Sequence, residues 1–209
     1  MQALAQNGNG QAAYIDTLSE AQKVLVDQLT GALFPIANDV KIQVEFNPSQ
    51  IAEYRLIGYE TRALRREDFN NDAVDAGEIG AGHSVTALYE VTPVGSPARL
   101  SDPLRYAPAA DLPESDELGF LRIRYKEPGS PVSQLIERPL VSDTENPGAN
   151  GFAAAVAGFG QLLTEDRYLG GWGWDEAIDA ALATRGDDPF GYRTEAIRLM
   201  RLAQSLDAR

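Results

Sequence analysis

Residues 40–91 read VKIQVEFNPSQIAEYRLIGYETRALRREDFNNDAVDAGEIGAGHSVTALYEV, and this stretch decides the fold. Its first seven residues alternate strictly between apolar and polar side chains. A period of two is typical of a strand that turns one face to a core and the other to water. The stretch therefore predicts an antiparallel β module. The apolar positions of this first strand are Val40, Ile42, Val44 and Phe46.

Further short strands follow, separated by turn residues and a polar loop at 68–82. Several short strands with turn signals between them and no helical pattern are typical of a β-sandwich. Residues 40–149 are therefore predicted to form an antiparallel sandwich. The remaining predicted strands are Tyr54–Tyr59, His83–Val91, Phe120–Lys126 and Val132–Leu140.

Residues 1–39 predict one short strand and one helix. Ala12 to Ile15 have strand character, and Thr17-Leu18-Ser19-Glu20 reads as a capping box at a helix start. The helix would present Leu18, Leu25 and Leu29 on one face. A lone strand and helix cannot close a core, so this face needs another cover.

From residue 150 the apolar period becomes helical, which predicts three short helices in a tail at 150–209. Asp175 is expected to cap the second helix, and Asp187-Asp188-Pro189 to open the third. So short a bundle has little apolar surface of its own, and we expect it to pack on the sandwich. The complete expectation is an α+β chain in three parts, 1–39, 40–149 and 150–209. The residues predicted to be largely buried in the tail are Phe152, Phe159, Trp174 and Tyr192.

Composition narrows the function classes. The chain has 209 residues, of which 44% are hydrophobic, and a net charge of −13. Such a charge repels nucleic acid and anionic lipid. The sequence has no cysteine, which excludes disulfides, thiolate metal sites and cysteine nucleophiles. No apolar run is long enough to span a membrane, and MQALAQNGNG has neither a basic end nor an apolar signal core. We expect any export signal to lie outside this chain.

The loop Asp68–Glu78, DFNNDAVDAGE, is the best candidate for a site. It places oxygen ligands at the first, third and fifth positions of a calcium loop. However, Ala73 stands where a glycine makes the sharp turn, Ile79 stands where a bidentate glutamate belongs, and Glu78 falls one residue early. We therefore predict no ordered metal and a loop held by hydrogen bonds from side chains to backbone. The three candidate ligands are Asp68, Asn70 and Asp72.

Other candidate sites are weaker. Residues 77–84, GEIGAGHS, nearly spell a phosphate-binding loop, but His83 stands where the lysine belongs and a strand is predicted where a helix should follow. We interpret these glycines as backbone freedom in a tight connection. His83 is the only histidine, so it offers neither a triad nor a zinc site. Trp172 and Trp174 are predicted to fill the join between helices and sandwich.

Three segments carry a resemblance to a known family. YRLIGYE at Tyr54–Glu60, the run from Glu67 to His83 and the following SVTALYEV resemble the C-terminal part of bacterial von Willebrand factor type A (VWA) proteins, some described as chloride-channel homologues. GNGQAAYIDTLSEAQKVLVDQL resembles the last strand and helix of the VWA domain itself. The helical tail, with FAAAVAGFGQLL and GYRTEAIRLMRLA, is also similar to the family pattern.

The resemblance implies a chain that begins inside a VWA domain and belongs to the cell envelope. Family members bind a divalent cation through an Asp-x-Ser-x-Ser loop, which this sequence lacks. The first hypothesis is thus a non-catalytic scaffold or protein-binding module that flanks a VWA domain, without a cofactor, catalytic residues or a metal. A calcium-stabilised binding module built on Asp68–Glu78 is the alternative, and an enzyme of unknown type is the third. Expected partners are a protein, the rest of the VWA domain or a second copy in a homodimer. Nucleic acid and membrane insertion are not expected.

Overall fold

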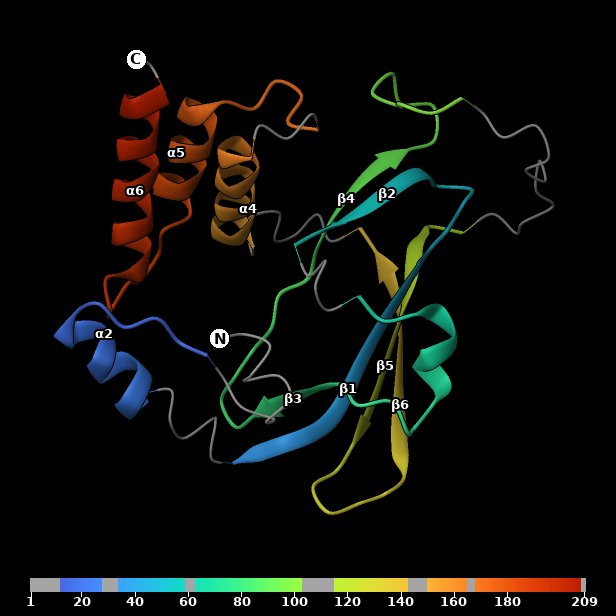
Figure 1. The fold of residues 1–209 in the computed structure, drawn as a ribbon. Coiled ribbons are helices and arrows are strands. Elements are labelled where there is room, and N and C mark those ends of the chain that lie inside the picture. Colours follow the sequence, from blue (N-terminus) through green and yellow to red (C-terminus); the bar gives the residue numbers. More distant parts are fainter. Residues whose placement is uncertain are drawn as a thin grey trace. The chain divides into compact units, whose positions relative to one another are not determined.

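The fold of this chain is α+β, with antiparallel sheets and helices (Figure 1). The computed structural model describes residues 12–27, 34–58, 63–102, 115–142, 150–164 and 168–207. The chain divides into two compact units. The first holds most of residues 1–142, and the second holds residues 143–209 together with the short segments 56–58 and 86–89. The division into 1–39, 40–149 and 150–209 stays a prediction, as does packing of the helices on a sandwich.

Within the described residues, four strands form the larger sheet, in the order β3-β1-β5-β6 with every neighbouring pair antiparallel. A second sheet pairs β2 with β4. The antiparallel module predicted from the alternation is confirmed, and β1 and β5 are longer than the pattern indicated. The larger sheet comprises β1 (Pro35–Phe46), β3 (Gly77–Gly80), β5 (Glu117–Lys126) and β6 (Ser133–Val141), and the smaller one β2 (Ile51–Ile57) and β4 (Leu88–Pro93).

The two predicted segments at 68–82 and 83–91 need correction. Gly77–Gly80 forms strand β3, whereas the sequence indicated loop, because these residues find partners along the first half of β1. Conversely, residues 83–87 are irregular and β4 begins only at Leu88. Local pattern could not reveal either change, since both depend on which backbone lies alongside.

The register of the larger sheet separates its two faces. Ile42 lies opposite Ile123, which lies opposite Ile136, so three isoleucines form a row across β1, β5 and β6. Because side chains alternate along a strand, the neighbouring row falls on the other face. That row contains Lys41 and Arg124. The sheet therefore has one apolar face and one strongly charged face.

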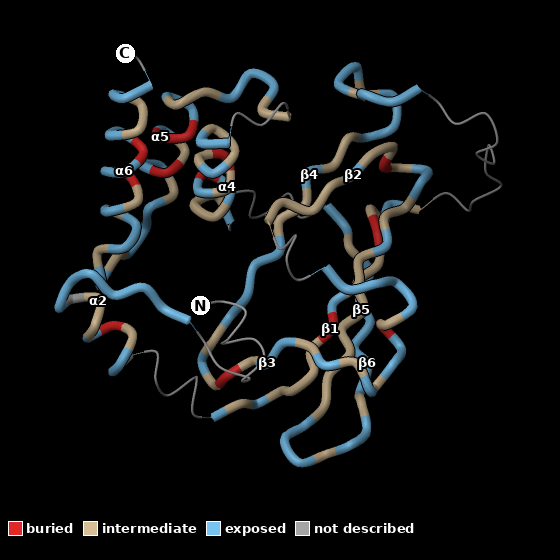
Figure 2. The backbone as a smooth tube through the Cα atoms, viewed as in Figure 1, coloured by how far each residue is buried: buried red, intermediate tan, exposed pale blue. Residues whose placement is uncertain are grey.

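Three helices after residue 150 are confirmed, and they share one core. They are α4 (Gly151–Leu163), α5 (Trp174–Ala183) and α6 (Tyr192–Asp207). Figure 2 shows their buried positions in red. Phe152 and Phe159 pack on this core while staying partly exposed. The buried residues of the core are Ala155, Ile178, Ala181, Ile197 and Met200.

Of the two aspartates predicted to begin helices, Asp188 does so at α6 and Asp175 does not at α5. Asp188 accepts hydrogen bonds from the backbone N–H groups of Arg193 (3.2 Å) and Thr194 (2.8 Å), so it supports the first turn of α6 as predicted. Asp175 does not cap α5, because the helix begins one residue earlier. Its carboxylate instead accepts a hydrogen bond from Gln204 on α6 (2.7 Å).

The tryptophans both pack within the helical unit. The ring of Trp172 lies against Gly158 of α4, and the Trp174 ring meets Phe159 edge-on at 6.0 Å between centroids. The Nε1–H of Trp174 also donates to Asp207 of α6 (2.7 Å). The predicted burial of Tyr192 is wrong, since 38% of it is exposed at the start of α6.

The N-terminal helix is short. α2 (Leu18–Gln22) continues into a π-helical turn at Lys23–Asp27. The capping box is confirmed: Thr17 Oγ1 accepts the Glu20 N–H (3.2 Å), and the Glu20 carboxylate accepts the Asp16 N–H (3.1 Å). The strand predicted at residues 12–15 is wrong, because these residues pair with no strand in the described part of the chain.

Two leucines of the helix and the turn that follows it are exposed. Leu18 is 87% exposed and Leu25 is 57% exposed, while Leu29 lies outside the described residues. In the described ranges, no helix has both the length and the apolar content needed to cross a bilayer.

The contact between Gly158 and Trp172 yields a test. A Cβ at Gly158 would overlap the Trp172 ring, whereas a Cβ at Gly160 meets nothing within 4 Å. Gly160→Ala should stabilise the protein by about 0.5–1 kcal/mol through helix propensity. Gly158→Ala should lose that gain to overpacking, which costs about 1–3 kcal/mol. Urea unfolding of both variants measures this difference, and equal stabilisation by both would contradict the packing described here.

Candidate functional site

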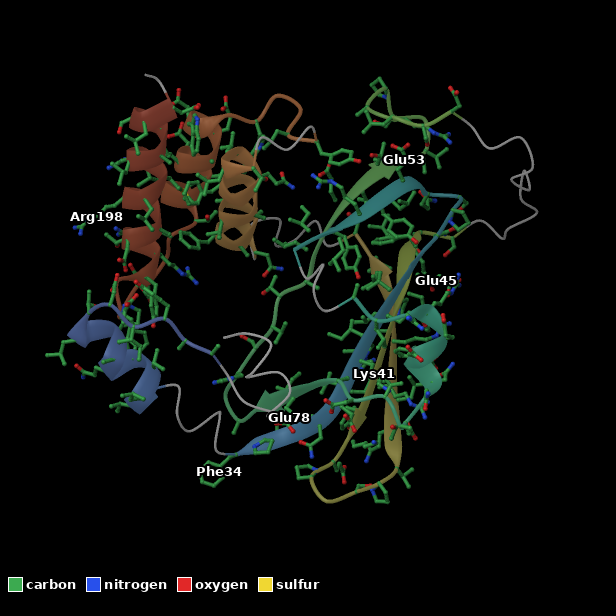
Figure 3. All side chains as sticks on the ribbon, in the orientation of Figure 1. Phe34, Lys41, Glu45, Glu53, Glu78 and Arg198 are labelled. Atoms are coloured by element: carbon green, nitrogen blue, oxygen red, sulfur yellow. The ribbon has the colours of Figure 1, made fainter. Side chains whose placement is uncertain are left out.

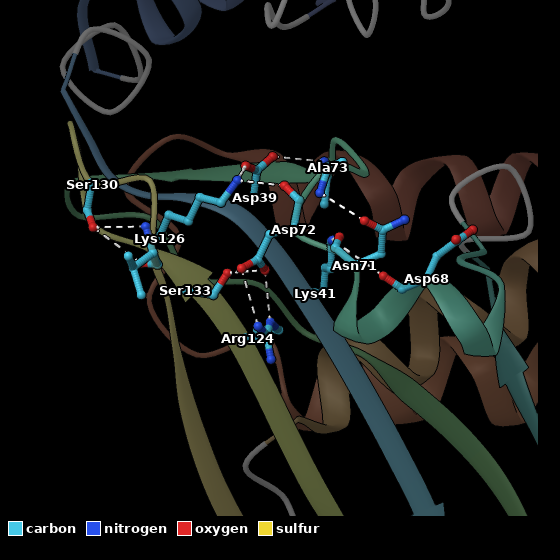
Figure 4. A network of polar contacts seen from close by, with 12 residues as sticks. Asp39, Lys41, Asp68, Asn71, Asp72, Ala73, Arg124, Lys126, Ser130 and Ser133 are labelled. Atoms are coloured by element: carbon cyan, nitrogen blue, oxygen red, sulfur yellow. Dashed lines mark hydrogen bonds and ion pairs between the residues drawn. The ribbon is translucent and has the colours of Figure 1, made fainter.

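The segment between β2 and β3 lies on the charged face of the larger sheet (Figure 4). It opens with a 3-10 turn, η3 (Arg66–Asn70), in which Phe69 is buried at 4% exposure. Residues 71–76 then lead to β3. It overlaps the loop Asp68–Glu78 that the sequence singled out, whose last two residues belong to β3. We call residues 66–76 the clamped loop.

Lys41 of β1 holds the middle of the clamped loop. Only 3% of this lysine is exposed, and its Nζ donates hydrogen bonds to the backbone carbonyls of Asp68 (3.4 Å) and Asn71. A buried ammonium group is costly unless its hydrogens find acceptors. The two carbonyls supply acceptors, so Lys41 ties the loop to β1 from beneath (Figures 3 and 4).

Asp72 is bound by two side chains of the sheet. Arg124 Nε donates to Asp72 Oδ1 at 3.1 Å, and the Ser133 hydroxyl donates to the same oxygen at 2.5 Å. The hydrogen bond from Ser133 and the guanidinium of Arg124 lower the pKa of the Asp72 carboxyl. Asp72 therefore attaches the clamped loop to strands β5 and β6.

Asp39 and Lys126 form the third attachment. Asp39 sits at a register irregularity of β1 and has a φ of 51°, a left-handed conformation uncommon outside glycine. Its carboxylate pairs with Lys126 Nζ (2.6 Å) and accepts the Ala76 N–H (3.2 Å). Lys126 Nζ also donates to the Asp72 carbonyl (2.9 Å). Burial raises the pKa of Asp39, but Lys126 and Ala76 lower it more, so it lies below its usual value.

The arrangement differs from a calcium loop. Asn71 Oδ1 accepts the Ala73 N–H (3.0 Å), an Asx turn of the kind predicted. The sequence did not reveal the three cations from β1 and β5, because strand register alone brings them beneath the loop. Asp72 faces Arg124 and Ser133, while Glu78 is exposed on β3. Among the described residues, no three acidic or histidine side chains gather where they could hold a metal ion.

Residues 77–84, which nearly match a phosphate-binding loop, form a strand and a turn. Its first four residues form β3, and Gly82 has a φ of 77°, which confirms its role as a permissive turn residue. The His83 N–H donates to the Gly80 carbonyl (3.1 Å), which closes the turn.

Comparison with known proteins places the chain beside one curated relative. Residues 31–206 match the model of a family described as "Uncharacterized protein YfbK, C-terminal". The chain is 49% identical over 210 residues to the Escherichia coli (strain K12) protein described as "Uncharacterized protein YfbK". The match covers 99% of this chain and 36% of that protein. No solved structure gives a significant match.

The contacts of Asp72 predict insensitivity to calcium. A calcium site of useful affinity needs about six to eight oxygens, and Asp72 already serves Arg124 and Ser133. Adding millimolar calcium should leave the melting temperature unchanged in differential scanning fluorimetry. A rise of several degrees that Asp68→Asn with Asp72→Asn abolishes would establish the calcium-stabilised alternative.

The lowered pKa values of Asp39 and Asp72 predict acid sensitivity. Both carboxyls ionise more readily in the folded chain than at the ordinary value of 3.8. Their stabilisation is therefore complete above about pH 4 and is lost as the pH falls through the folded-state pKa. Asp39→Asn with Asp72→Asn should lower stability at pH 7 and flatten its decline between pH 4 and 2.

Urea unfolding across this pH range measures the decline. Asp179→Asn, at an exposed position of α5, is the control and should follow the parent protein. A decline in the double variant as steep as the parent's would show that the clamp does not set the acid sensitivity.

Proposed function

The chain belongs to the family defined by the C-terminal region of YfbK, and on this premise we propose that it is a non-catalytic scaffold and protein-binding module within a longer protein. The observation that carries the proposal is the exposure of two isoleucines on the apolar face of the larger sheet. Ile42 is 44% exposed and Ile136 is 41% exposed, although both belong to the isoleucine row across the sheet. An apolar sheet face is stable when another layer covers it.

The charged face of the sheet differs from the apolar face in having a partial cover of its own. The clamped loop covers the part of this face around Lys41, which is buried, while Leu135 in the same row is 49% exposed. Part of the charged face thus has a cover within the described residues, whereas no residue of the isoleucine row is fully buried. A partner surface with apolar side chains is the natural cover for this row.

A flanking VWA domain is the partner that the sequence resemblance favours. The helix at Leu18–Gln22 resembles the last helix of such a domain, and its exposed Leu18 also needs a neighbour. In this proposal the sheet and the N-terminal helix contact the VWA domain of the longer protein, in the cell envelope. A β-sandwich would result if the smaller sheet closes on the larger one; the rings of Phe46 and Tyr54, 4.7 Å apart, join β1 and β2 in this sense.

A role without catalysis is consistent with the carboxyls of the clamped loop. Asp39 and Asp72, which have lowered pKa values, are both engaged by cationic side chains that fix a loop. Lowered pKa values of this origin belong to structural ion pairs, since a general acid or base needs a pKa near the working pH.

Photo-crosslinking at β6 tests the proposal. Ile136 lies on the apolar face, while Leu135 is the adjacent residue on the charged face and is 49% exposed. A benzophenone amino acid at 136, in the complete protein expressed in cells, should form cross-links that map to a VWA domain or to another protein. The same probe at 135 is the matched control and should form few.

Two results would contradict the proposal. One is equal cross-linking from positions 135 and 136. The other is cross-linking from 136 that maps wholly within the chain described here, because the apolar face would then be covered without a partner.

A further inference from the structure

Strand β6 forms one edge of the larger sheet (Figure 1). Among the strands of the described ranges, β5 is its one neighbour. The direction of the backbone groups of β6 follows from β5. The Asn47 N–H donates to the Leu118 carbonyl (2.9 Å), so Leu118 and every second residue after it in β5 bond toward β1. The backbone of Ile123 therefore points to β6, and that of its partner Ile136 points to β5.

The outward backbone groups of β6 belong to the residues on either side of Ile136. Leu135 and Glu137 each turn one N–H and one C=O away from β5, because the direction alternates along a strand. Pro139 belongs to the same outward series, where its missing N–H interrupts no bond to β5. Outside the sheet ladder, the structure gives the backbone of Leu135 and Glu137 no hydrogen-bond partner among the described residues. An edge of this kind is completed by another strand.

The sequence of β6 is suited to pairing with itself. In an antiparallel pair of two β6 strands centred on Ile136, the two Ile136 side chains lie opposite each other, and the isoleucine row continues into the second copy. Leu135 of each copy then exchanges backbone hydrogen bonds with Glu137 of the other. Centring on Glu137 or Arg138 would oppose like charges, and centring on Leu135 would set Ile136 against the polar Gln134. A shift of one residue would mix the two faces.

The register centred on Ile136 also brings opposite charges together. It places Arg138 of one copy opposite Gln134 of the other, and the Gln134 side chain donates to the Glu127 carboxylate (2.8 Å). Within the described ranges, neither Glu127 nor Arg138 forms an ion pair. In the pair, each guanidinium lies beside the Gln134–Glu127 contact of the other copy, and the two-fold axis repeats this attraction.

We propose that β6 pairs antiparallel with β6 of a second copy of the chain, which joins the two larger sheets into one. This contact uses the edge of the sheet and is separate from the contact proposed for its apolar face. A single strand pair is a small interface, so the association strengthens with protein concentration and is not permanent.

Disulfide trapping in the intact chain tests the register. The sequence has no cysteine of its own. Opposite residues of a pair without hydrogen bonds have Cα atoms about 4.5 Å apart, which a disulfide can span. On mild oxidation, Ile136→Cys should form a linked dimer about tenfold faster than Gln134→Cys or Arg138→Cys alone. A mixture of the Gln134→Cys and Arg138→Cys chains should form the linked heterodimer, because these positions face each other.

Exchange of charges provides the second arm, measured by sedimentation velocity over a series of concentrations. Arg138→Glu should weaken self-association about tenfold, and adding Glu127→Arg to it should restore the association. Arg198→Glu is the matched control, since Arg198 is equally exposed but lies on α6 in the other unit of the chain. It should leave association unchanged, and circular dichroism should show the same fold for every variant.

Three results would overturn the assignment: equal trapping from positions 134, 136 and 138, an association that Arg138→Glu does not weaken, or a chain that stays monomeric at every concentration. The last would leave the edge to a strand of another protein. A photo-cross-link from 136 to a second copy doubles the mass of the product and is counted apart from one to a VWA domain. Failed trapping with cross-links to a VWA domain would therefore refute the edge pairing alone, and the reverse pattern would refute the proposed face contact alone.

Discussion

The pairing of β1 with β5 is the constraint on which the rest of the β unit depends. Ile42 lies opposite Ile123, and Lys41 lies opposite Arg124. The apolar residues of the two strands therefore share one face of the sheet, and these cationic residues share the other. A shift of one residue would mix isoleucines with cations on both faces. The register of β1 and β5 thus gathers apolar side chains on one face and lysines and arginines on the other. The charged face needs carboxylates and carbonyls as partners, and the apolar face needs a cover.

The charged face meets its requirement within the chain. Lys41, Arg124 and Lys126 lie where the clamped loop offers carbonyls and the carboxylate of Asp72, and Asp39 supplies a further anion from the irregularity in β1. Of the two acidic residues that suggest a cation site in the sequence, Asp72 is paired with Arg124, and Asp68 offers its backbone carbonyl to Lys41. The apolar face has no comparable cover among its described neighbours, which is why it carries the proposed function.

Sequence analysis predicted those features that local chemistry determines. The alternation at Val40–Phe46, the capping box at Thr17 and Glu20 and the role of Asp188 at α6 all appear in the structure. It missed strand β3 and the cations beneath the clamped loop, because both depend on long-range register. It also expected Tyr192 to be buried, since periodicity alone does not say which face of α6 packs inward.

The central claim is that the isoleucine row of the sheet is open in this chain and covered in the complete protein. The most direct measurement is paramagnetic relaxation of the Ile42, Ile123 and Ile136 methyl groups by a soluble nitroxide, in the isolated chain and in the complete protein. The account predicts strong relaxation in the isolated chain and protection in the complete protein, while Leu135 on the opposite face is relaxed in both. Isoleucine methyl groups that are already protected in the isolated chain would contradict it.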